Sequence, residues 1–120
     1  MKTNYVIIPT FNDWKSLNKL IGVLSNSLKI PNVKFFLIII DDCSTDKIYL
    51  EKTRYKNIKR IEVISLKENV GSQKAIFLGL KHLRRKIKSF SSNDTVSILD
   101  SDGEDNPAKL KKLIKYALKK

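Results

Sequence analysis

Residues 33–46 read VKFFLIIIDDCSTD, and the fold class can be inferred from them. Its apolar part has almost no alternation of polar and apolar side chains. It therefore predicts a β-strand over residues 33–40 that is buried on both faces, as in a parallel sheet covered by helices. The strand runs directly into two adjacent acids, Asp41 and Asp42. Adjacent like charges at the end of a buried strand cost stability unless something positive lies against them, so this strand end is a candidate functional position.

Strands and helices alternate along the rest of the chain. Apolar, β-branched runs predict strands over residues 5–8, 58–66 and 95–99, the second of them nearer a sheet edge because its pattern is more alternating. Apolar residues at helical spacing predict helices that begin near residues 14, 72 and 107, and a short helix is predicted over residues 44–54. The alternation predicts an α/β fold: a Rossmann-like, three-layer α/β/α domain over residues 1–120 with a mainly parallel four-stranded sheet.

The predicted helices carry apolar stripes, and that of the helix from residue 107 consists of Leu110, Leu113, Ile114, Ala117 and Leu118. The stripe of the first consists of Trp14, Leu17, Leu20, Ile21, Leu24 and Leu28, and that of the helix from residue 72 consists of Ile76, Leu80, Leu83 and Ile87. These stripes are expected to face the sheet.

The charge balance favours anionic partners. The chain has 24 Lys and Arg against 12 Asp and Glu, a net charge of +12, which suits nucleotide phosphates, nucleic acid or an anionic membrane face. Cys43 is the only cysteine, so no disulfide forms within the chain and a reducing, cytoplasmic compartment is expected. The longest apolar run, residues 35–40, is far shorter than the roughly 20 residues of a membrane span.

The unusual residues follow the predicted strands. Residues 9–13, 41–42, 67–71 and 100–105 each come directly after one strand. In parallel sheets wrapped by helices, ligands bind beyond the carboxyl ends of the strands. Four separate loops are therefore expected to converge on one edge of the sheet.

A second acid cluster, LDSDGED over residues 99–105, follows the last predicted strand. Asp100 and Asp102, spaced Asp-x-Asp, can face one Mg²⁺ or Mn²⁺ ion shared with substrate phosphates. The alternative is a solvated turn around Gly103. A calcium-binding EF-hand is excluded because its glycine position holds Asp105.

The segment NVGSQKAIFLGL, residues 69–80, combines a glycine turn with the start of a helix. Backbone N–H groups at such a start can face an anion. Lys74 lies in the first turn, where it could reach a phosphate or be an ordinary exposed lysine. The segment matches neither the dinucleotide-binding nor the P-loop glycine pattern.

Four segments together resemble one family. VIIPTFND, IIIDDCSTD, ENVGSQKAIFLGL and ILDSDGEDNP occur in the order, and at roughly the spacing, of the nucleotide-binding half of family 2 glycosyltransferases. The closest similarity is to the polyprenyl-phosphate, dolichol-phosphate mannose synthase-like branch. These are inverting enzymes of the GT-A fold, so the resemblance implies a truncated GT-A fold.

The resemblance implies two groups of site residues. Pro9, Phe11 and Asp13 match the segment that lines the base and ribose pocket, Phe11 standing for the usual Tyr and Asp13 for the usual Glu. Asp42 matches the residue that hydrogen-bonds the base, with Asp41 beside it. The remaining nucleotide-binding residues implied are Asn69, Gly71, Lys74 and Asp100, and the implied metal ligands are Asp100, Asp102 and Glu104, the last standing where that branch usually has Gln.

The activity implied is metal-dependent transfer of a sugar, with inversion, from a UDP- or GDP-linked donor. The cofactor would be Mg²⁺ or Mn²⁺, and the acceptor a lipid phosphate or a glycan, as in cell-envelope glycan synthesis. In the family the acceptor-binding half and its catalytic base follow the Asp-x-Asp strand. We therefore expect this chain to carry the donor half-site only, to show little or no turnover alone, and to self-associate through exposed sheet edges.

Two alternatives remain open. One is a non-catalytic nucleotide- or metal-binding module on the same fold. The other, a basic nucleic-acid-binding protein, is supported by the charge, but the acids gathered at the expected rim would repel phosphates, so no specific nucleic acid is expected. Basic residues in 81–88 and 109–120 could instead contact an anionic membrane, which suggests a peripheral position at its inner face.

Overall fold

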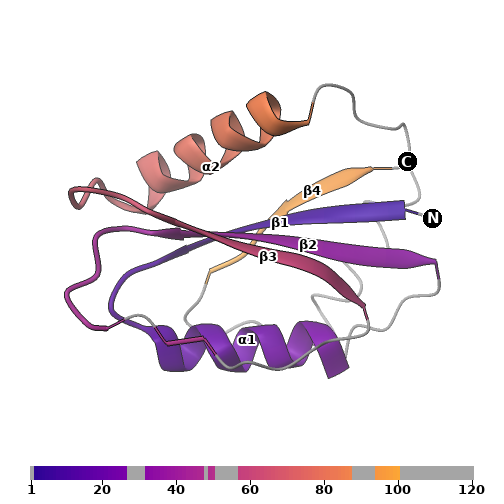
Figure 1. Cartoon of the computed structure of the whole chain (residues 1–120), viewed down its shortest axis with the longest axis horizontal. Coiled ribbons are helices and arrows are strands. Elements are labelled where there is room, and N and C mark those ends of the chain that lie inside the picture. The colour runs from indigo at the N-terminus through magenta and orange to yellow at the C-terminus, as the bar shows by residue number, and fades with distance from the viewer. Residues whose placement is uncertain (1, 27–31, 48, 51–56, 88–93, 101–120) are drawn as a thin grey trace.

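Four parallel strands form the centre of the fold in the computed structural model, which describes residues 2–26, 32–47, 49–50, 57–87 and 94–100. The elements, in chain order, are β1 (Lys2–Thr10), α1 (Trp14–Asn26), β2 (Val33–Asp41), β3 (Ile58–Ser65), α2 (Ser72–Lys86) and β4 (Thr95–Ile98). The strand order is β3-β2-β1-β4. Helix α1 covers one face of the sheet and α2 the other (Figure 1). The α/β, three-layer prediction is confirmed, as is the edge position of β3.

Alternate residues of the two central strands serve two separate cores. Val6 and Ile8 of β1 face α1, whereas Ile7, between them, faces α2. Because both faces are covered, neither strand needs polar residues, and this accounts for the unbroken apolar run of β2. The α1 core contains Trp14, Leu17, Leu20, Ile21 and Leu24 together with Phe35, Leu37 and Ile39 of β2. The predicted stripe of the first helix is thus confirmed over the described residues, and Leu28 lies outside them.

The predicted stripe of α2 is partly wrong. The helix buries Ala75, Gly79 and Leu83, while Leu80 stays 39% exposed. A Cβ atom added at Gly79 would lie 2.9 Å from Cγ2 of Ile7, so the helix axis lies unusually close to the strands at this point. The small residues permit this approach, and they turn the larger Leu80 away from the sheet.

The short helix predicted over residues 44–54 is wrong for its described part. Residues 44–47 and 49–50 form a non-helical loop. Side-chain oxygens, not preceding carbonyls, accept the N–H groups of Ser44, Thr45 and Asp46. The helix predicted from residue 107 lies outside the described residues.

The outer strand β4 is attached to β1 partly through polar side chains. The Nδ2 group of Asn4 lies 2.6 Å from Oγ1 of Thr95 and 3.1 Å from Oγ of Ser97. Val96 and Ile98 remain exposed on this strand, so apolar surface does occur at a sheet edge, and self-association stays a prediction. Within the described residues, no helix is both long and apolar enough to span a membrane.

Glu62 of β3 joins the edge of the sheet to α2. Its side chain is 13% exposed and contacts Nε2 of His82 at 3.2 Å, the ammonium group of Lys86, and Nε of Arg60 at 3.4 Å. Burial alone would raise the pKa of the Glu62 carboxyl. The hydrogen bonds from Lys86 and His82, with the charges of Lys86 and Arg60, outweigh burial and leave the pKa below its ordinary value.

Two glycine-to-alanine variants measure how closely α2 approaches the sheet. Both Gly79→Ala and Gly22→Ala add the same helix propensity, about 1 kcal/mol. At Gly22 the new methyl group meets no atom within 4 Å, so we expect stabilisation. At Gly79 it meets Ile7, and Gly79→Ala should be less stable than Gly22→Ala by about 1–3 kcal/mol. Urea unfolding of both variants checks this, and equal stabilities would show that the contact relaxes freely.

Replacing Glu62 tests the ionic link in a pH-dependent way. Because the folded-state pKa of Glu62 is lowered, its contribution is complete above the ordinary pKa of a glutamate and is lost as the pH falls through the folded-state value. Glu62→Gln should therefore lower the free energy of unfolding by about 1 kcal/mol near neutral pH. The difference from the wild type should vanish in acid.

The matched control is Glu68→Gln, at an exposed residue that makes no ion pair with other described residues. It changes the net charge equally and should leave the stability profile as it is. A constant difference between Glu62→Gln and the wild type from neutral to acid pH would contradict the assignment.

Candidate functional site

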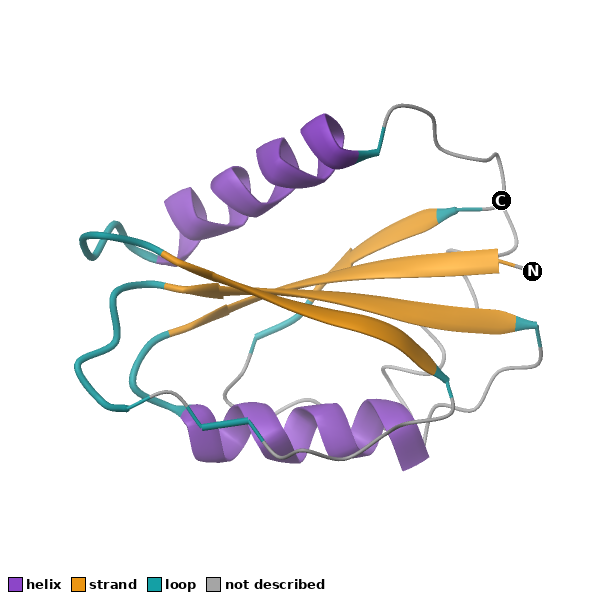
Figure 2. Ribbon diagram, viewed as in Figure 1, coloured by secondary structure: helices purple, strands orange, loops and turns teal. Residues whose placement is uncertain are grey.

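The loops after β1, β2 and β3 leave the sheet at the same edge (Figure 2). Thr10 pairs with Asp41, and Asp41 with Ser65, so these three strands end level with one another. Strand β4 runs parallel beside β1, and the N–H of Leu99 donates to the carbonyl of Ile7 at 3.1 Å. We call this edge the carboxyl rim.

Asp42 provides the central contact of the rim. Its side-chain oxygens accept the N–H groups of two consecutive residues: Oδ1 accepts from Val70 at 2.7 Å and Oδ2 from Gly71 at 2.9 Å. The residue is only 4% exposed. Two backbone donors at the amino end of α2 therefore offset the buried charge. The anion that this helix start faces is the carboxylate of the chain itself.

Asp41 is also held by backbone donors. Its Oδ1 accepts the N–H of Ser44 at 3.0 Å, and its carbonyl accepts the N–H of Leu66 at 2.8 Å. The tight turn between the two acids and the loop has Cys43 in the left-handed region, with φ of 61°. Backbone N–H groups of the described residues thus contact both of the adjacent carboxylates.

Asn12, which the sequence reasoning did not select as a site residue, connects the first two rim loops. Its Oδ1 accepts the N–H groups of Thr45 at 2.8 Å and Asp46 at 3.1 Å, and its own N–H donates to Oγ of Ser44 at 2.8 Å. The residue has φ of 50°, a conformation that asparagine tolerates better than most residues. We call this set of contacts the Asn12 clamp. The only local signal for it was the Asn-Asp pair after the first strand.

The other predicted residues after β1 differ in their surroundings. Pro9 is buried in the strand, whereas Phe11 is 48% exposed at the rim. Asp13 caps α1, since its Oδ1 accepts the N–H of Ser16 at 3.3 Å and its carbonyl that of Leu17 at 3.1 Å. A cap at this position satisfies donors that the helix start would otherwise leave unpaired.

The residues around the start of α2 lie together with Asp42. The Nδ2 group of Asn69 donates to the carbonyl of Asp42 at 3.2 Å. Gly71 has φ of 88°, in the region that favours glycine, and this conformation turns its N–H toward the carboxylate. Lys74 is exposed in the first turn of α2.

The implied metal ligands are only partly within the described residues. Asp100 is exposed just after β4, where the chain runs toward the rim beside β1. Asp102 and Glu104 lie outside the described residues. Within the described part, no three His, Cys, Asp or Glu side chains form a group that could hold a metal ion. An exposed carboxylate such as Asp100 suits a hard divalent ion.

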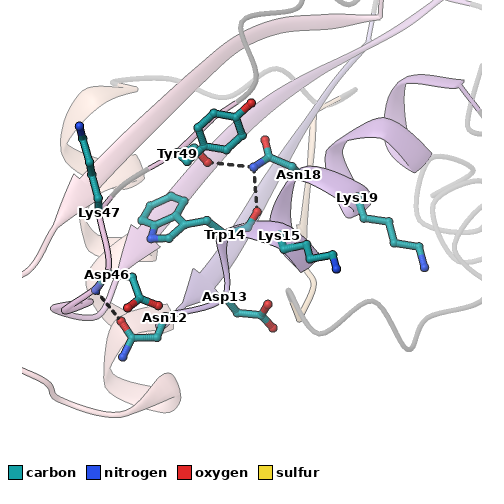
Figure 3. Close-up of a pocket in the computed structure, with 9 residues that line it drawn as sticks. All are labelled: Asn12, Asp13, Trp14, Lys15, Asn18, Lys19, Asp46, Lys47 and Tyr49. Carbon is teal, nitrogen blue, oxygen red and sulfur yellow. Dashed lines mark hydrogen bonds between the residues drawn. The ribbon is translucent and has the colours of Figure 1, made fainter.

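A groove of about 610 Å³ lies on the α1 side of the rim (Figure 3). It is lined by Asn12, Asp13, Trp14, Lys15, Asn18, Lys19, Asp46, Lys47 and Tyr49. Asn18 donates from Nδ2 to the carbonyls of Trp14 and Tyr49, both at 2.8 Å, and so fixes the loop against α1. Of the predicted nucleotide-binding residues only Asp13 lines this groove, so it is separate from the loop contacts made by Asp42.

The chain matches a family model over nearly its whole length. The family is described as glycosyl transferase family 2, and the match covers residues 5–120. Two curated relatives agree with it. The poly(ribitol-phosphate) β-N-acetylglucosaminyltransferase TarS of Staphylococcus aureus is 30% identical over 106 residues, which is 88% of this chain and 17% of TarS. A dolichol-phosphate mannosyltransferase of Pyrococcus furiosus is 26% identical over 109 residues, 91% of this chain and 28% of that enzyme.

Solved structures show the same fold. The crystal structure of S. aureus TarS 1–349 superposes with a TM-score of 0.62 at 29% identity, covering 97% of this chain and 32% of that one. The structure of the same protein in complex with UDP-GlcNAc gives a TM-score of 0.62 at 25% identity, with 97% and 31% covered. The chain thus spans less than a third of the length of these relatives. Its fold is of the GT-A type, and the chain belongs to glycosyl transferase family 2.

Proposed function

We propose that the carboxyl rim binds a nucleotide-diphospho-sugar, so that this chain is the donor-binding half of an inverting, metal-dependent glycosyltransferase. The observation that carries the proposal is the meeting of three preorganised loops at the edge that β4 and Asp100 also approach. Family membership supports the reaction class. The TarS complex with UDP-GlcNAc supports a uridine nucleotide ahead of GDP as the donor.

The rim offers groups for each part of such a donor. The exposed ring of Phe11 can stack on a base, and Pro9 and Asp13 border it on the same segment. Lys74, exposed one turn into α2, can reach a phosphate. Asp42 already accepts two backbone N–H groups, so we propose that it acts first by holding the loop of Asn69 in place. A carboxylate has about four acceptor positions, and two of them remain for a base N–H.

The diphosphate is the part of the donor that needs a cation. When bound, Mg²⁺ or Mn²⁺ would neutralise the charge on the leaving diphosphate. Asp100, with Asp102 and Glu104, would hold it. An acceptor oxygen would attack the anomeric carbon from the face opposite the diphosphate, and the new C–O bond would form as the bond to the departing nucleoside diphosphate breaks, which inverts the configuration. A glycan hydroxyl would give its proton to a general base, whereas a lipid phosphate has no such proton to lose. The acceptor we propose is a lipid phosphate or a glycan, reached from the cytoplasmic side.

Calorimetric titration with UDP, GDP, CDP and dTDP, each with and without Mn²⁺, tests the proposal. We expect UDP to bind only when Mn²⁺ is present, because the ion offsets the repulsion between the diphosphate and the acid cluster. Asp102→Ala should abolish this binding. The matched control is Asp94→Ala, at the amino end of β4 and therefore at the opposite edge of the sheet, which should bind as the wild type does. If none of the four nucleotides binds, the proposed site is wrong for this chain.

The Asn12 clamp gives a second test at the same rim. Asn12→Gly keeps the positive φ without strain but removes the bonds to Thr45 and Asp46. We expect UDP affinity in the presence of Mn²⁺ to fall about tenfold, because the two loops are no longer held in register. Calorimetry measures the affinity, and thermal unfolding measures the stability.

The control for this variant is Asn57→Ala. It removes the hydrogen bond from Nδ2 to the carbonyl of Leu24, at the amino end of β3. Both variants should lose some stability, but Asn57→Ala should keep its UDP affinity. Unchanged affinity in Asn12→Gly would mean that the clamp stabilises the fold without positioning the donor site.

A further inference from the structure

Helix α2 has an outer surface of one sign of charge. Its sequence, SQKAIFLGLKHLRRK, contains no acidic residue. Lys86 is paired with Glu62, but the other cations, Lys74, Lys81, Arg84 and Arg85, are exposed and make no ion pair with another described residue. A run of unpaired cations on one helix is an attractive surface for an anionic partner.

Two large apolar side chains lie among these cations. Phe77 is 60% exposed and Leu80 is 39% exposed. Residues three and four apart are neighbours on a helix surface. Phe77 is therefore adjacent to Lys81 and to Leu80, and Leu80 to Arg84. Gly79 has no side chain and lets this face of the helix lie close to the sheet, so the larger residues point away from the core.

The other helix shows that this surface is not a general property of the chain. Helix α1 also carries exposed cations, Lys15 and Lys19, and has no acidic residue. Its large apolar side chains are buried against the sheet, however, except Val23, which is partly exposed. Exposed apolar side chains and unpaired cations occur together on α2, on the opposite face of the molecule (Figure 1).

We propose that the outer face of α2 binds the surface of an anionic lipid bilayer. Phe77 and Leu80 enter the boundary between headgroups and acyl chains, while Lys74, Lys81, Arg84 and Arg85 contact the lipid phosphates. This division between an apolar pair and a surrounding cationic set is the composition of helices that lie in a membrane interface. The charge alone would also suit nucleic acid, but the exposed apolar pair favours lipid.

The surface is linked to the carboxyl rim through the backbone. Helix α2 begins at the turn whose Val70 and Gly71 N–H groups bind Asp42. The rim loops adjoin the amino end of α2. A bilayer bound along the outer face of this helix therefore has the rim loops at one end of its contact. The inference does not depend on the proposed donor site, because lipid binding is measured without any nucleotide.

Sedimentation with lipid vesicles tests this proposal on the full chain. We expect the wild type to sediment with vesicles of phosphatidylcholine mixed with phosphatidylglycerol, and to stay in solution with vesicles of phosphatidylcholine alone. The double variant Lys81→Glu/Arg84→Glu should lose about tenfold or more in apparent affinity, because two contacts with lipid phosphate become repulsive. Circular dichroism checks that each variant is folded.

The matched control is Lys15→Glu/Lys19→Glu, which has the same net charge but alters α1. It should bind the mixed vesicles nearly as well as the wild type. Equal loss in the two double variants would overturn the proposal, since it would show that only the total charge attracts the lipid. Failure of the wild type to bind the mixed vesicles would overturn it as well.

A second set of variants tests the apolar contact. Phe77→Gln/Leu80→Gln keeps the helix propensity and the charge, and should weaken vesicle binding severalfold. Tyr49→Gln, which removes a 64% exposed aromatic ring from the α1 side of the molecule, should not weaken it.

Fluorescence of the Phe77→Trp variant tests the same contact. Its emission should shift to the blue on addition of mixed vesicles, because residue 77 enters the lipid. The other tryptophan, Trp14, is buried, so its emission stays constant. Absence of this shift would reject the lipid assignment. Preserved vesicle binding in Phe77→Gln/Leu80→Gln, together with tighter binding to a DNA oligonucleotide than to vesicles, would also reject it and would identify a nucleic-acid surface.

Discussion

The hydrogen bonds from Val70 and Gly71 to the carboxylate of Asp42 are the constraint on which the rest of the rim depends. They connect the end of the central strand β2 to the start of α2, which covers the face of the sheet opposite α1 (Figure 1). A buried carboxylate without such donors would cost several kcal/mol. The two donors come directly before Ser72, the first residue of α2, and Gly71 itself has no side chain to cap the helix. One interaction therefore places both the acidic strand end and the helix.

The Asn12 clamp extends this arrangement to the neighbouring loop. Asp42 holds the loop after β3 and Asn12 holds the loop after β2, so three loops are fixed to one another by side chains of the chain itself. Preorganised loops reduce the entropy lost when a ligand binds. For the proposed donor site, loops held in this way would need less ordering when a donor binds.

The two helices pack differently against the two faces of the sheet. Helix α1 buries a full stripe of large side chains, which makes its face a conventional core. Helix α2 approaches through Ala75 and Gly79, and its large residues Phe77 and Leu80 remain outside. Close packing through small residues thus leaves apolar surface on the far side of the helix, where it can serve an interaction.

The pattern of apolar residues was enough to predict the layers of the fold and the edge at which the loops after the strands meet. An unbroken apolar run predicts a central parallel strand because only burial on both faces tolerates it, and parallel strands bring the loops that follow them to one edge. The apolar pattern did not predict that Asp42 bonds Val70, 28 residues away, or that Asn12 bonds the loop of Asp46, because these contacts form only in the tertiary structure. The same holds for the buried face of α2. Periodicity records which side chains are apolar, but the distance between helix and sheet decides which of them fit between the two, and hydrogen bonds between distant loops leave no periodic trace in the chain.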